Sequence, residues 1–175
     1  GWVSRHGIPL PALDAEGVVD SGGRRLLAGQ PAPDTQLRLA AGGLLLVQGS
    51  QLVLLPSAGG APQREEVERC EGQPVVAATA RRLLWVSQGR LLRSGPWGPV
   101  ELGQVLAGRT RLWVGEQLGL ALSRGGRLCS AALFDPERPG LLEQPALGPL
   151  PGVWHRTHCS FSEELAWLSV EGRSG

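Results

Sequence analysis

A short module of apolar strand, glycine-bearing turn and apolar strand returns along this chain. Its clearest copies span residues 44–55 around Gly49, residues 83–92 around Gly89, and residues 118–134 around Gly126. Partial copies lie at Trp2 before Gly7 and at Trp167 before Gly172. The five turn glycines are separated by 42, 40, 37 and 46 residues. A period near 40 residues indicates a repeat architecture in which one small unit of several strands recurs.

The strands of this module are apolar at consecutive positions instead of alternate ones. Leu44-Leu45-Leu46-Val47 and Leu83-Leu84-Trp85-Val86 show no period of two. A strand with one solvent face alternates, whereas a strand buried on both faces is a continuous apolar run. We therefore expect an all-β fold whose inner strands pack against neighbours on both sides, in preference to a two-layer sandwich.

The repeated Trp/Leu-Val-x-x-Gly hairpin of residues 37–134 resembles the inner hairpin of a β-propeller blade, in the loose sense of the WD-repeat and related superfamilies. The chain has neither the Trp-Asp pair nor the Gly-His start of true WD repeats. The resemblance implies an all-β, propeller-like repeat of about four antiparallel blades in a single domain, residues 1–175. Residues 1–36 form an irregular N-terminal segment with a hairpin at 18–27, and residues 37–175 hold the repeats. The absence of methionine indicates a fragment or processed chain; an incomplete ring of blades would favour self-assembly.

Two segments have helical alternatives. Residues 64–69 are charged and bounded by Pro62 and Gly72, which allows a helix of two turns at most. Ser160 and Glu163 fit a capping box ahead of residues 165–168. We favour a strand there, because Trp167-Leu168-Ser169 matches the repeat at Trp85-Val86-Ser87.

Missing residue types exclude several kinds of chemistry. The chain has no Lys, Asn, Tyr or Met, and its 17 basic residues are all arginine, which indicates a GC-rich coding sequence. Without lysine there is no Walker phosphate loop, Schiff base or Ser-Lys dyad. Residues 1–87 hold eight arginines and eight acids, and residues 88–175 hold nine and eight. Neither half is basic enough to suggest nucleic acid, and Arg81-Arg82 is interpreted as solvated charge.

Segment length and cysteine content bear on the compartment. No stretch approaches the ~18 apolar residues of a membrane helix, so we expect no membrane insertion. The three cysteines are Cys70, Cys129 and Cys159. An odd, sparse set is typical of a reducing compartment, so we expect a cytoplasmic protein.

His155, His158 and Cys159 are the candidate ligands for a metal, with Cys129, Cys70 or His6 as a fourth. Their spacing argues against zinc, because His155 and His158 would lie on opposite faces of a strand. A nucleophilic Cys159 would lack a third, orienting residue. We therefore expect no cofactor and no enzymatic activity.

Trp97 differs from the other five tryptophans because glycine and proline surround it, in Gly95-Pro96-Trp97-Gly98-Pro99. Trp2, Trp85, Trp113, Trp154 and Trp167 lie in apolar runs and are predicted to be packing residues. Trp97 either tucks its loop onto the body or contacts a partner, together with Arg93. The leading hypothesis is a non-enzymatic protein-binding or scaffolding module with another protein as partner. The alternatives are a lectin-like carbohydrate-binding module that uses Trp97 and, third, a zinc- or cysteine-dependent enzyme.

Overall fold

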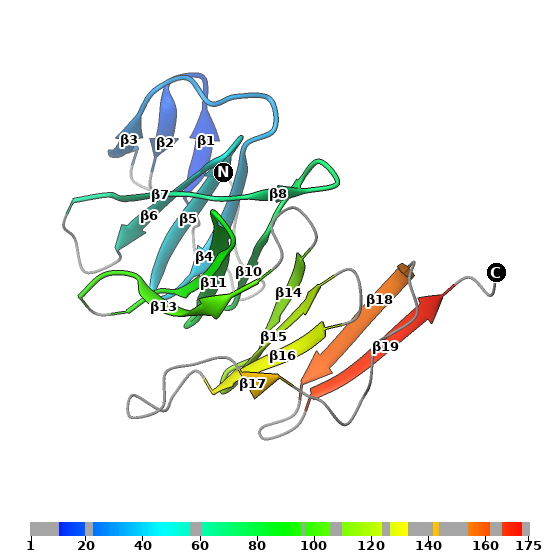
Figure 1. The fold of residues 1–175 in the computed structure, drawn as a ribbon. Coiled ribbons are helices and arrows are strands. Elements are labelled where there is room, and N and C mark those ends of the chain that lie inside the picture. The colour runs from blue at the N-terminus through cyan, green and yellow to red at the C-terminus, as the bar shows by residue number, and fades with distance from the viewer. Residues whose placement is uncertain are drawn as a thin grey trace.

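The computed structural model describes residues 11–19, 23–56, 61–95, 97–105, 110–123, 127–132, 142–143, 154–161 and 166–172, with side chains up to residue 119 and at Ala121. These ranges form antiparallel sheets and contain no helix, so the chain is all-β as expected. Figure 1 shows the sheets following one another in chain order, with β1–β3 and β18–β19 at opposite ends. The described residues thus do not close into a ring.

Three sheets share one design, in which four consecutive strands pair in sequence order. The first contains β4 (Gln36–Ala40), β5 (Gly43–Gln48), β6 (Gln51–Pro56) and β7 (Gln63–Glu66). The second contains β10 (Val76–Ala78), β11 (Leu83–Ser87), β12 (Arg90–Arg93) and β13 (Val100–Gln104). The third contains β14 (Thr110–Val114), β15 (Leu118–Ser123), β16 (Arg127–Ala132) and β17 (Leu142–Glu143). We call these the first, second and third repeat sheets.

Smaller sheets complete the described chain. A three-stranded sheet holds β1 (Ala12–Asp14), β2 (Gly17–Val19) and β3 (Arg25–Ala28). Two hairpins hold β8 (Arg69–Cys70) with β9 (Gln73–Pro74), and β18 (Trp154–Phe161) with β19 (Ala166–Gly172). The pairing of β2 with β3 confirms the predicted hairpin near the N-terminus, and β1 adds a strand that the sequence left irregular.

Apolar clusters fill the spaces between successive sheets. On β5, Leu44 and Leu46 pack toward β1–β3, while Leu45 and Val47 pack toward the second repeat sheet. β11 repeats this arrangement, because Leu83 and Trp85 face the first repeat sheet whereas Leu84 and Val86 face the third. Burial of these strands on both faces, expected from their continuous apolar runs, is therefore confirmed.

The repeat sheets approach each other most closely along their first strands, since β10 lies against both β4 and β14. Hydrogen bonds join the turns that follow those strands. Gly42 N donates to Ala80 O at 2.8 Å, and Arg82 Nε donates to Glu116 O at 3.0 Å. The turns after β4, β10 and β14 consequently lie side by side at one end of the sheets.

The structure corrects two local predictions. The helix that the sequence allows at residues 64–69 does not form, because Arg64 and Glu65 pair with Val53 and Leu52 and so extend the first repeat sheet as β7. Gly172 is not in a turn, because it ends β19 and pairs with Trp154.

Other local predictions agree with the fold. Gly49 and Gly89 take the positive φ angles, 57° and 73°, that their hairpin turns require. The strand chosen at Trp167 is confirmed as part of β19, while Gly7 and Gly126 lie outside the described residues. Among the described residues, no helix is long and apolar enough to cross a membrane.

Candidate partner-binding surface

Trp97 extends into solvent from the loop that joins β12 to β13. Its side chain is 98% exposed, and the only other exposed large apolar side chain among those described is Leu39, at 55%. The loop turns tightly, with Gly98 N donating to Gly95 O at 3.3 Å. A Cβ on Gly95 would lie 2.8 Å from the carbonyl oxygen of Gly98, and Gly98 has φ +124°. The two glycines therefore permit a turn that points Trp97 away from the body, which excludes the tucked-in alternative.

Arg93 ends β12, four residues before Trp97, and is half-buried. It pairs with Leu84 of β11, so it lies on the sheet face that packs toward the third repeat sheet. Its Nη1 reaches Ser94 O at 3.5 Å, a long contact, and its guanidinium makes no other hydrogen bond to the residues that the structure describes. Arg93 therefore lies at the rim of the space between the second and third repeat sheets.

Arg81 and Arg82 form the turn between β10 and β11. Thr79 Oγ1 accepts hydrogen bonds from Arg81 N at 3.3 Å and from Arg82 N at 3.0 Å, which fixes the turn. Arg82 lies two residues before Leu84 and so shares the face of Arg93. Burial lowers the pKa of the Arg82 guanidinium, the Glu116 carboxylate opposes this effect, and the positive charges of Arg93 and Arg81 add to it.

These residues share one end of the second repeat sheet. In a meander of four antiparallel strands, the first and third connections lie at the same end, and here they hold Arg81-Arg82 and Trp97 respectively. We name Arg81, Arg82, Arg93 and Trp97 the Trp97 surface. Interpreting Arg81-Arg82 as solvated charge missed this grouping. The spacing of the repeats could have revealed it. Aligning the units on Gly49 and Gly89 places Arg81-Arg82 opposite Ala41-Gly42, in the turn between the first two strands of the unit.

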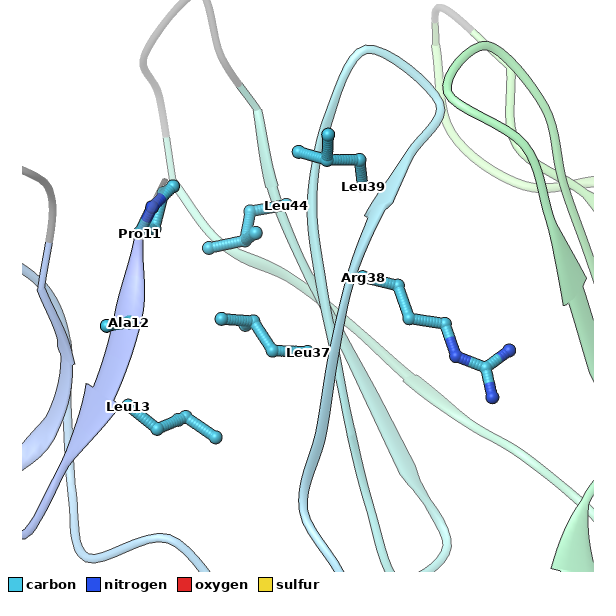
Figure 2. Close-up of a pocket in the computed structure, with 7 residues that line it drawn as sticks. All are labelled: Pro11, Ala12, Leu13, Leu37, Arg38, Leu39 and Leu44. Atoms are coloured by element: carbon cyan, nitrogen blue, oxygen red, sulfur yellow. The ribbon is translucent and has the colours of Figure 1, made fainter. Parts of the chain in front are cut away.

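A separate apolar pocket of about 350 Å³ opens between β1 and β4 (Figure 2). Leu13, Leu37 and Leu44 point into it. Arg38, which follows Leu37 on β4, points away from it. Arg38 Nη2 donates to Gln36 Oε1 at 2.5 Å. The lining residues described here include no acid–base pair, so they supply shape and apolar surface but no acid–base chemistry.

The three principal candidate metal ligands, His155, His158 and Cys159, lie on β18, whereas Cys70 lies on β8. His155 falls at a register shift, His158 pairs with Ser169 and Cys159 pairs with Leu168. Their side chains are outside the described ones, as are His6 and Cys129, so the metal hypothesis stays a prediction. Among the side chains that are described, no three His, Cys, Asp or Glu gather closely enough to hold a metal ion.

Of the five tryptophans predicted to be packing residues, two have side chains that the structure describes. Trp85 is 2% exposed and belongs to the core, as predicted, and Trp113 is half-buried on β14. Trp2, Trp154 and Trp167 lie outside the described side chains.

A scan against protein-family models and a search of curated proteins both find no match.

Proposed function

We propose that this chain is a non-enzymatic protein-binding or scaffolding module whose contact region is the Trp97 surface. The observation that carries the proposal is the 98% exposure of Trp97 on a loop anchored at both ends by strands. Tryptophan and arginine are the residue types most enriched at the energetic centres of protein interfaces. A tryptophan buries about 150–250 Å² when covered, so contact at Trp97 would supply a large share of a small interface.

The architecture that best accommodates this module is an arc of propeller-like blades. Three observations support it: the recurring four-stranded meander, the burial of β5 and β11 on both faces, and the close approach of the first strands. In propellers the loops at one end of the blades commonly carry the binding site, which is where the Trp97 surface lies. Open end sheets would allow further blades from a second copy to join the arc. We place the module in the cytoplasm.

A carbohydrate is the second ligand class, because an exposed tryptophan also stacks on sugar rings. The other three residues of the Trp97 surface are arginines, which donate hydrogen bonds but accept none. A sugar hydroxyl both donates and accepts, so this neighbourhood suits protein carboxylates and carbonyls better. The third hypothesis, a zinc- or cysteine-dependent enzyme, rests on the β18 residues alone.

Quantitative capture from cell lysate, with the intact chain as bait, tests the proposal when variants are compared. Trp97→Ala removes the exposed ring, and Leu39→Ala is the matched control because it removes the other exposed large apolar side chain. We expect a set of proteins that wild type and Leu39→Ala retain and Trp97→Ala loses. Both variants should unfold within about 0.5 kcal/mol of wild type, as exposed sites do. Identical sets from all three would refute the role of Trp97, and glycan-array binding abolished by Trp97→Ala would favour the lectin.

A further inference from the structure

We propose that the Trp97 surface recognises an acidic protein segment, in which carboxylates bind Arg82 and Arg93 and a neighbouring apolar side chain covers Trp97. This inference rests on the proposed binding function and specifies its partner. Its basis is the placement of Arg81, Arg82 and Arg93 at the same end of the second repeat sheet as Trp97, whose side chain is 98% exposed.

The strand register brings two guanidinium groups together. Arg93 is paired with Leu84. Arg82 directly precedes β11 and lies two positions before Leu84, so the alternation of side chains, continued by one residue, makes the two arginines diagonal neighbours. Such neighbours are about 7–8 Å apart at Cα, within reach of long side chains. The effect of the Arg93 charge on the Arg82 pKa agrees with this proximity. A carboxylate is the group that two adjacent guanidinium forks bind most strongly in a protein partner.

Several arginines of the described chain form ion pairs with nearby carboxylates. Arg69 approaches Asp34 at 3.4 Å, Arg111 approaches Glu71 at 3.2 Å, and Arg25 bridges Asp14 and Glu16. Arg81 and Arg93, like Arg38 and Arg64, form no ion pair with any residue that the structure describes. The Trp97 surface therefore holds three positive charges, against the carboxylate of Glu116 that acts on Arg82, on a chain whose formal net charge is only +1.

Local charge of this kind suits an acidic segment better than a nucleic acid. Nucleic-acid sites need a basic stripe that follows many phosphates, and the two halves of this chain are each close to neutral. Three arginines at the same end of a sheet as one exposed tryptophan match a short motif with two or three carboxylates and one apolar anchor. Attraction between opposite charges also speeds encounter, so binding should weaken as salt rises.

Arg82 is held differently from Arg81 and Arg93. Its Nε already donates to Glu116 O, which fixes the stem of the side chain and aligns the second and third repeat sheets. A guanidinium held in place loses less side-chain entropy when it binds a ligand. Arg82 therefore positions the site as well as contributing charge. Its replacement could lower stability and affinity together, so a loss of binding in an Arg82 variant would not report on recognition alone.

Fluorescence anisotropy with a defined peptide tests the inference. The probe is a labelled short peptide in which pairs of glutamates alternate with phenylalanine, and its control has glutamine at every glutamate. The protein is the full 175-residue chain. The variants are Arg93→Gln, Arg81→Glu and Trp97→Ala. Arg64→Glu, at an exposed position on β7, is the control, because it changes the charge by the same amount as Arg81→Glu. Unfolding midpoints measured on the same samples show whether each variant is folded.

We expect the acidic peptide to bind at least about tenfold tighter than the glutamine peptide. Arg93→Gln, Arg81→Glu and Trp97→Ala should each weaken binding about fivefold or more, while Arg64→Glu leaves it within about twofold. Equal binding of both peptides, equal loss with Arg64→Glu, or equal competition by a single-stranded oligonucleotide would overturn the inference. No binding of either peptide would also overturn it. Lysate capture that still depends on Trp97 would then leave the proposed function standing with a different partner chemistry.

Discussion

Leu83 and Leu84 are adjacent on β11, yet each belongs to a different apolar cluster. Leu83 is 3% exposed and packs with Leu45 and Ala40, whereas Leu84 is fully buried and packs with Val75 and Leu102. In a sheet with one solvent face, one of two adjacent residues would be dispensable. We predict that Leu83→Ala and Leu84→Ala each lower the free energy of unfolding substantially.

The expected size follows from the burial of the two side chains. Truncation of a buried leucine to alanine costs about 2–5 kcal/mol, from lost transfer energy and the cavity left behind. A domain of this size has a total stability of about 5–15 kcal/mol, so either change removes a large fraction. Leu39→Ala is the control, because truncating a side chain that is 55% exposed loses little burial and should cost about 0.5 kcal/mol or less.

Urea unfolding followed by far-ultraviolet circular dichroism measures all three variants, with linear extrapolation to water. The reasoning about burial on both faces predicts two large losses of similar size and a small one for Leu39→Ala. If only one of the two β11 variants loses more than about 1.5 kcal/mol, one face of this sheet is open. That result would contradict the stacked arrangement of repeat sheets.

Two further predictions follow from single contacts. The hydrogen bond from Arg25 Nη1 to Asp14 Oδ1, at 2.6 Å, holds the pKa of Asp14 below its usual 3.8, so the stabilisation is present above pH 3.8 and is lost as pH falls through the lower folded value. Arg25→Gln should raise the Asp14 pKa toward 3.8 in an NMR titration, and no change would contradict the pairing. Gly43→Ala would push a Cβ into the Leu55 carbonyl oxygen of the paired strand and should cost about 1–3 kcal/mol in urea unfolding. A loss under about 0.5 kcal/mol would mean that β5 and β6 are less closely paired at this point.

The sequence predicted the elements that apolar runs and turn glycines define. The hairpins around Gly49 and Gly89 and the two-sided burial of Leu44–Val47 follow from local patterns. Residues 64–69 remained open to a helix because their charges suggest an exposed element of either kind. Their β structure depends on pairing with Leu52 and Val53, which are more than ten residues away. Local propensity does not contain that information.

Trp97 could be singled out from its glycine and proline neighbours, but its exposure could not be deduced, since the same loop composition also suits a ring folded back on the sheet. The link between Arg93 and Arg82 was likewise hidden. It arises from the register of β11 and β12 and from the alignment of neighbouring turns through Arg82 Nε and Glu116 O. Both depend on how strands and sheets are placed in three dimensions.

The pairing of every repeat sheet in strict chain order also bears on how the protein reaches its native state. Each sheet completes its hydrogen bonding within a short stretch, residues 36–66 for the first and 76–104 for the second. Sheets that pack together are also neighbours in the chain. The sequence separation between contacting residues is therefore small for a β protein, and low contact order accelerates folding. Folding can start in any single meander and spread to the adjacent one, so growth from the ribosome would assemble the sheets one after another, each using its finished predecessor as a template.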